Sequence, residues 1–203
     1  PFEGFRALDL TGTQNDSAEA IYNPEKYLLY CDPFMGQFDN RVKSGDAAGY
    51  ADCAARLAVY ADHAEYGYLF RSLRALCAFL SVKADLGIRT RAAYLSGDKK
   101  AAKALCTDYD AALERLDAFY AAYEQQWMHE NKPQGFDVID LRIGGQRQRL
   151  LHCRDRLLAY AEGRLDRIEE LEEPVLDCCC EEKADGQAMR AIFWHEIASA
   201  NVI

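Results

Sequence analysis

A single apolar stripe along residues 102–127 constrains the fold of this chain more than any other feature of its sequence. Its members recur at intervals of three and four residues, and they are Ala102, Leu105, Tyr109, Leu113, Leu116, Tyr120, Tyr123 and Trp127. This spacing places every member on one face of an α-helix. Because such a helix is stabilised mainly by covering its apolar face, the sequence predicts that it packs against other helices.

Shorter segments before and after this stripe also show helical patterns. A first helix is expected within residues 23–39, since Asn23 can cap it and Pro24 suits the first helical position. Further helices are expected from near Asp46, over residues 69–80 up to a break at Gly87, over residues 90–95, from Asp137, and over residues 189–198. The predicted fold class is therefore all-α, a bundle of about five to seven helices with short connections.

Charge and hydropathy exclude two classes of partner. The formal net charge of -9 disfavours a general nucleic-acid binder, because phosphate contacts need a basic face. No apolar run approaches the length of a membrane span, and no signal peptide is visible. Neither a nucleic acid nor a membrane is expected as a partner. The first residue is Pro1 and not Met, which favours a fragment or a processed chain.

The cysteine pattern favours free thiols. Of the 8 cysteines, those outside the run Cys178-Cys179-Cys180 stand alone, and several lie in helical patterns, as expected for small buried apolar residues. Without a pair of CxxC motifs, a reducing cytosol and a cytoplasmic location are predicted. The run of three could indicate a metal, but adjacent residues rarely converge on one tetrahedral ion. We expect neither a metal nor a cofactor.

The long stripe ends in a segment of different composition, residues 127–150. Pro133 cannot continue a helix, and Gly135 lets the chain reverse. Asp137 can cap a new helix, and Asp140 follows three residues later, in a carboxylate variant of the capping box. The segment therefore predicts a hairpin of two helices.

Two features of the second hairpin helix have more than one interpretation. Gly144 and Gly145 each cost about 1 kcal/mol of helix stability against alanine, which is tolerated where another backbone or a ligand comes close. Arg142, Arg149 and Arg156 recur every seven residues. They form either a solvated stripe paired with nearby carboxylates or a docking surface for another domain or subunit.

The aromatic and polar residues at the turn also leave alternatives open. Trp127 either belongs to the core or stacks on a sugar. Glu130 and Asn131 either fix the turn or face a neighbouring pocket. The four histidines are scattered without a nucleophile partner, and the acidic run at residues 169–173 is typical of a solvated helix end. Taken alone, these residues predict no active site.

Two stretches in combination resemble a known family. NPEKYLLYCDPFMGQFD (residues 23–39) and ENKPQGFDVIDLRIGGQRQRL (residues 130–150) resemble the region after the catalytic barrel in one branch of glycoside hydrolase family 20. That branch contains bacterial exo-β-N-acetylglucosaminidases, or β-hexosaminidases, whose C-terminal domain is all-helical. In this family a (β/α)₈ barrel carries an adjacent Asp-Glu pair that acts with the substrate's acetamido group. This chain contains no Asp-Glu dipeptide, so no catalytic residue is carried over.

The resemblance implies an accessory role. Residues 1–40 would be a linker and docking helix following the missing barrel, and residues 41–203 the C-terminal helical domain. The residues expected to dock on the barrel are Asn23, Tyr27, Tyr30, Asp32 and Phe38. The candidates for a second interface or for the rim of the substrate pocket are Trp127, Glu130, Asn131, Asp140, Arg142, Gly144, Gly145 and Arg149.

The partners implied are the upstream barrel of the same polypeptide and a second copy in a homodimer, with a β-N-acetylglucosaminide as the substrate of the parent enzyme. An alternative is a stand-alone helical module that binds another protein. An autonomous enzyme that uses a cysteine or a carboxylate pair is disfavoured, because the sequence shows no nucleophile and base in a recognisable arrangement.

Overall fold

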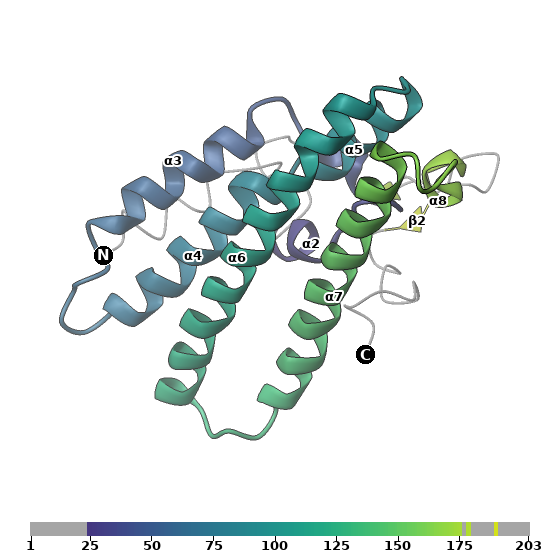
Figure 1. Cartoon of the computed structure of the whole chain (residues 1–203). Helices are drawn as coiled ribbons and strands as arrows, with labels where there is room; N and C mark the ends of the chain where they lie inside the picture. Colours follow the sequence, from purple (N-terminus) through teal and green to yellow (C-terminus); the bar gives the residue numbers. More distant parts are fainter. Residues whose placement is uncertain (1–23, 176–177, 180–188, 191–203) are drawn as a thin grey trace.

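The computed structural model describes residues 24–175, 178–179 and 189–190, and these form a predominantly helical structure. Three long helices lie side by side: α4 (Gly67–Lys83), α6 (Lys99–Glu130) and α7 (Phe136–Ala161) (Figure 1). The helix α3 (Asp46–Ala58) packs on α4, on the side away from α6. The predicted all-α bundle is confirmed.

Shorter elements pack against this layer. The helix α2 (Pro24–Tyr30) packs against α4, and a 3₁₀ turn, η2 (Asp39–Arg41), follows it. The helix α5 (Leu86–Leu95) contacts α6, and α8 (Glu169–Glu172) lies beside α5. Two-residue strands, β1 (Cys178–Cys179) and β2 (Met189–Arg190), pair in parallel.

The apolar stripe of α6 fills the centre of the bundle along its first half. Ala102, Leu105, Tyr109, Leu113 and Leu116 are buried, as their spacing predicts. The stripe continues as half-buried aromatic rings towards the end of α6, where α6 and α7 extend together to the turn at residues 131–135 (Figure 1). The predicted hairpin of two helices is confirmed.

The break between α4 and α5 falls earlier than the sequence predicts. The helix α4 ends at Lys83, and Gly87 lies inside α5, which begins at Leu86 and not at residue 90. Gly87 serves close packing and does not end a helix, because a Cβ there would lie 2.9 Å from the carbonyl oxygen of Pro33. The presence of glycine at position 87 is therefore explained by a tertiary contact and not by local helix propensity.

Two predictions about α7 also need correction: the residue at which it begins and the role of Asp137. The helix begins one residue before Asp137, after Gly135 at φ +94°, so Asp137 is in the first turn and is not the cap. Its carboxylate accepts a hydrogen bond from the Gly135 N–H at 3.1 Å.

Two earlier predictions concern residues that the structure does not describe. Asn23 lies outside the described residues. The last predicted helix does so too, except Met189 and Arg190, which form β2.

Residues before position 40 belong to the same core as the rest. Leu28, Phe34 and Phe38 are buried within the hydrophobic cluster that also contains residues of α4, α6 and α7. The packing of the described residues shows no break near residue 40, and the division there into a docking segment and a helical domain stays a prediction about the parent enzyme. Among the described helices, none combines the length and the apolar character that crossing a bilayer requires.

Candidate functional site

A groove lies between α2, α4, α6 and α7, and we call it the central groove. Its volume is about 460 Å³. Apolar side chains from all four helices line it: Leu29, Leu73, Leu76, Phe119, Ile139 and Ile143. Polar groups of Glu25, Lys26, Ser72, Gln126 and Arg142 complete the lining, and the Glu25 carboxylate accepts a hydrogen bond from the Tyr50 hydroxyl at 3.4 Å. A mostly apolar hollow with a few polar groups is the usual form of a binding site.

A buried lysine holds α2 in place as one wall of the central groove. The Lys83 side chain is 3% exposed, and its Nζ donates to the carbonyl oxygens of Cys31 at 2.6 Å and Leu28 at 3.4 Å. Carbonyl groups in the last turn of a helix have no partner within that helix, so a cation there satisfies them and matches the helix dipole. Lys83 thus fixes the end of α2 to α4.

Arg142 lines the central groove without an acceptor of its own. Its Nε is buried and has no hydrogen-bond partner, and no ion pair joins Arg142 to a described carboxylate. Nearby, burial raises the pKa of Tyr30 to about 12, an effect that the positive charge of Arg142 partly offsets. The arginine and the phenol therefore lie close enough for an electrostatic interaction across the groove.

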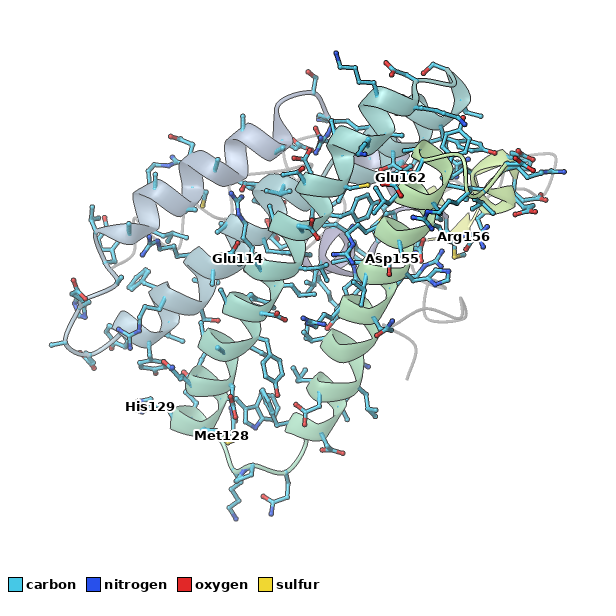
Figure 2. The ribbon with its side chains drawn as sticks, in the orientation of Figure 1. Glu114, Met128, His129, Asp155, Arg156 and Glu162 are labelled. Atoms are coloured by element: carbon cyan, nitrogen blue, oxygen red, sulfur yellow. The ribbon has the colours of Figure 1, made fainter. Side chains whose placement is uncertain are left out.

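The other two arginines of the seven-residue repeat are paired inside the domain. Arg149 binds Asp32 through two contacts, Nε to Oδ2 at 2.6 Å and Nη2 to Oδ1 at 3.2 Å, and its Nη2 also donates to Glu170 at 2.6 Å. Arg156 lies on the side of α7 that faces α8, with its Nη2 3.2 Å from Glu169 (Figure 2). Pairing with nearby carboxylates is therefore correct for Arg149 and Arg156, and not for Arg142.

The electrostatics of Asp32 follow from these contacts. Burial alone would raise the pKa of its carboxyl group, but the hydrogen bond and charge of Arg149, with the N–H groups of Met35 and Phe34, outweigh it and lower the pKa. Those two N–H groups donate to Oδ1 at 3.0 Å and 2.8 Å. Asp32 thus joins the loop after α2 to α7 as an ionised, fully bonded group.

At the hairpin end, Trp127 fixes the turn. Its Nε1 donates to the carbonyl oxygen of Lys132 at 2.9 Å, and its ring centroid lies 5.8 Å from that of Phe136. A Cβ at Gly135 would lie 3.4 Å from the indole. Figure 2 shows Met128 and His129 on the last turn of α6. The ring is half-buried by these contacts, which favour the core role over a free sugar platform.

The neighbouring polar residues also contact groups of this domain. Glu130 accepts a hydrogen bond from the Tyr68 hydroxyl at 3.0 Å. The N–H of Asn131 donates to the carbonyl oxygen of Trp127 at 2.8 Å, which closes α6. Asp140 accepts from the Tyr120 hydroxyl at 2.6 Å and so joins α7 to α6, although the sequence predicted that it caps a helix.

Another hollow, of about 310 Å³, lies between α6 and α7, and we call it the interhelix hollow. Its lining is Asp117, Tyr120, Asp140, Ile143, Gly144 and Arg147. Gly144 is exposed, and a Cβ there would meet nothing within 4 Å. Gly145 is half-buried. The described chain therefore gives no packing reason for glycine at position 144.

The residues predicted to dock on a barrel are mostly inside the domain. Tyr30, Asp32 and Phe38 are buried, and the Phe38 ring centroid lies 5.1 Å from that of half-buried Tyr27. These buried side chains therefore help to set the position of α2 and the loop that follows it.

Sequence reasoning missed Lys83, Leu73 and Gln126. Leu73 and Gln126 line the central groove, and Lys83 holds α2 in place as one of its walls. A lone lysine or glutamine in a helix carries no local signal of such a role.

The described residues offer little for metal or thiolate chemistry. Among them, no group of three or more His, Cys, Asp or Glu side chains could hold a metal ion. Cys31, Cys53, Cys77, Cys106 and Cys153 are buried free thiols. Burial raises the pKa of Cys31 to about 12 and raises those of Cys106 and Cys153. A thiol with a raised pKa is a poor nucleophile at neutral pH.

Comparison with known proteins identifies the family. A family profile described as "Glycoside Hydrolase 20C C-terminal domain" matches residues 1–190. The chain belongs to this family. No curated protein sequence matches it. The glycoside hydrolase 20C C-terminal domain thus accounts for the resemblance of residues 23–39 and 130–150, and the match also spans the helices between them.

Proposed function

We propose that this chain is the non-catalytic helical domain of a β-N-acetylhexosaminidase and that it packs on the catalytic (β/α)₈ barrel of the same polypeptide. The observation that carries this proposal is the match of residues 1–190 to the C-terminal domain of a glycoside hydrolase group. A C-terminal domain follows another module in its chain. The groups that act on the β-N-acetylglucosaminide would then belong to that module.

The chemistry of the described residues supports a non-catalytic role. The carboxylates of the acidic run that could resemble an acid–base pair are bonded to cations: Glu170 to Arg149, Glu169 to Arg156, and Glu172 to Arg167. The buried thiols have raised pKa values where a shift is seen, as in Cys77, whose thiol is hydrogen-bonded to Cys53 and buried. These groups hold helices together, and none is poised as a nucleophile.

Two surfaces are available for assembly in this proposal. The side of α7 with Gly144 and Gly145 offers a backbone that a neighbouring subunit can approach closely, which favours a homodimer. The hairpin end with Trp127 and Glu130 offers a rim that a substrate pocket could use. The free thiols of the described residues are typical of a reducing compartment, so the enzyme is proposed to be cytoplasmic.

The decisive experiment compares three proteins on a chromogenic β-N-acetylglucosaminide: the full-length enzyme, the enzyme truncated before this domain, and the 203-residue chain alone. We expect turnover by the full-length enzyme, none by the chain alone, and reduced stability or activity after truncation. Turnover by the chain alone would contradict the proposal, and so would a truncated enzyme of unchanged stability, activity and oligomeric state.

A point substitution tests the assembly surface separately. In the full-length enzyme, Gly145→Ala is expected to shift the dimer towards monomer in light scattering, while circular dichroism of the domain stays helical. Gln148→Ala, on an exposed position of the same helix, is the matched control and should leave the dimer unchanged. An unchanged dimer in the Gly145 variant would remove this surface from the proposal.

A further inference from the structure

We propose that the central groove holds an aspartate or glutamate side chain, carried on an apolar segment of the catalytic module, and that Arg142 is its ion-pair partner. This inference rests on the proposed function and adds the contact that joins the two modules. It differs from the expectation drawn from residues 23–39, because the contacting side chains come from four helices.

Arg142 is the exception among the arginines of α7. Arg147 pairs with Asp117, Arg149 with Asp32, and Arg154 with Asp110. Arg156 pairs with Glu169. Within the described part of the chain, Arg142 has no carboxylate partner, although the chain as a whole is acidic.

The position of Arg142 makes this exception costly. Its Nε is buried without an acceptor, and a buried donor left unbonded loses the hydrogen bond that water would supply to it. A guanidinium group has five donors and no acceptor, so only an acceptor can satisfy it. A carboxylate is the acceptor whose planar geometry and charge fit best. The missing partner is therefore expected to be acidic.

The shape of the central groove adds an apolar requirement. A volume of about 460 Å³ is enough for one or two large side chains, and Leu29, Leu73 and Ile143 would lie against them. Tyr30 and Tyr123 line the same groove, and the positive charge of Arg142 acts on the Tyr30 phenol. An acidic residue flanked by apolar residues would pair with Arg142 and pack against the apolar side chains that line the groove.

Position along the chain favours the catalytic module as the source. Helix α2 forms one wall of the central groove and is the first described helix. In a C-terminal domain, the preceding module is covalently attached on this side of the sequence. A covalent connection raises the effective concentration of a nearby segment far above that of a separate protein.

The occupant can be identified by photo-crosslinking in the full-length enzyme. A benzophenone amino acid replaces Gln126, which lines the central groove, and, as a control, Glu114, which is exposed on the middle of α6 (Figure 2). We expect the groove probe to join a peptide of the catalytic module that contains Asp or Glu beside apolar residues. A crosslink to this domain, from its own or a second copy, or no crosslink from the groove, would overturn the inference.

The role of Arg142 is tested by labelling a cysteine placed in the groove. In full-length Gln126→Cys enzyme, mass spectrometry follows labelling of the peptide that carries residue 126, so native cysteines do not interfere. Loss of a hydrogen-bonded charge pair changes an equilibrium about tenfold or more, so Arg142→Gln should accelerate labelling about tenfold. Arg142→Lys should accelerate it less. The control Arg147→Gln, which removes an exposed pair with Asp117, should change it less than twofold.

The two proposals fail in different ways. The inference fails if Gln126→Cys is labelled as fast as Glu114→Cys. It also fails if Arg142→Gln and Arg147→Gln change the labelling rate of Gln126→Cys equally. In either case the groove does not hold an acidic segment. The proposed function then still stands if truncation destabilises the enzyme. If truncation has no effect, the proposed function itself fails, and the labelling result decides nothing in its favour.

Discussion

Asp32 and Arg149 lie 117 positions apart in the sequence and form a two-point ion pair that joins the loop after α2 to the middle of α7. Glu170 contacts the same guanidinium, so three segments meet at one cation. Arg91 supports this junction from α5, because its guanidinium donates to the carbonyl oxygens of Leu171 and Phe34. The position of α2, and with it one wall of the central groove, depends on these contacts.

Removing the arginine of this pair should destabilise the domain strongly. Arg149→Met leaves the carboxylate of Asp32 buried without its cation, and we expect the free energy of unfolding to fall by about 2–4 kcal/mol. Asp32→Asn keeps an acceptor for the N–H groups of Phe34 and Met35 and should cost less, about 1–2 kcal/mol. Urea denaturation followed by circular dichroism measures both.

The control for this prediction is a pair of similar chemistry on the surface. Arg147 and Asp117 form an ion pair whose side chains are 47% and 51% exposed. Arg147→Met should therefore cost less than about 1 kcal/mol. Equal losses for Arg147→Met and Arg149→Met would show that the Asp32 pair has no special weight.

The same pair predicts how stability depends on pH. The pKa of Asp32 is lowered in the folded chain, because Arg149 and backbone N–H groups outweigh the effect of burial. Its stabilising contribution is therefore complete above the ordinary aspartate pKa of about 4 and is lost as the pH falls through the lower folded value. Denaturation curves from pH 7 to pH 3 should show this loss, and Asp32→Asn should make the decline shallower. Asp117→Asn, on the surface, should leave the slope nearly unchanged.

Elements with a local signal could be predicted from the sequence. The spacing of Leu105, Tyr109 and Leu113 defines the buried face of α6, because helical periodicity depends only on neighbours along the chain. Pro133 and Gly135 define the turn for the same reason. Gly87 shows the limit of this logic, because its close approach to Pro33 depends on a contact between distant segments.

The candidate site depended on contacts that no local pattern contains. Arg142 and Arg149 share one spacing and one helix, yet only Arg149 meets a carboxylate, since Asp32 and Glu170 are brought to it by the loops after α2 and α7. The central groove likewise forms only when α2, α4, α6 and α7 pack together, which no local pattern specifies. Tertiary packing also buries Tyr30 and Phe38, which a local pattern does not reveal, and docking of residues 23–39 on the barrel stays a prediction.

Trp127 should stabilise the hairpin turn through both its ring and its N–H group. Trp127→Phe keeps an aromatic ring near Phe136 but loses the hydrogen bond to the Lys132 carbonyl, so we expect a loss of about 1 kcal/mol. Trp127→Ala also removes the ring contacts and should cost about 3 kcal/mol. Thermal unfolding gives the order of the two. If both variants matched the parent chain in stability, the turn would not depend on Trp127, and a role in contacting a ligand would gain support.

The glycines of the hairpin should respond to alanine in opposite directions. Gly144 is helical, and a Cβ there meets nothing within 4 Å, so Gly144→Ala should raise the free energy of unfolding by about 1 kcal/mol. Gly135 has φ +94°, and its Cβ would lie 3.4 Å from the Trp127 ring, so Gly135→Ala should lower it by about 1–2 kcal/mol.

Measuring the Gly144 variant in two settings separates folding from assembly. In the chain alone, urea denaturation should show the gain in stability. In the full-length enzyme, the same methyl group lies where a neighbouring subunit is proposed to approach α7, so the dimer should dissociate at higher protein concentration than in the parent enzyme. A variant that is more stable alone and unchanged in assembly would mean that Gly144 faces solvent in the enzyme as well, and the proposed contact surface would have to lie elsewhere on the domain.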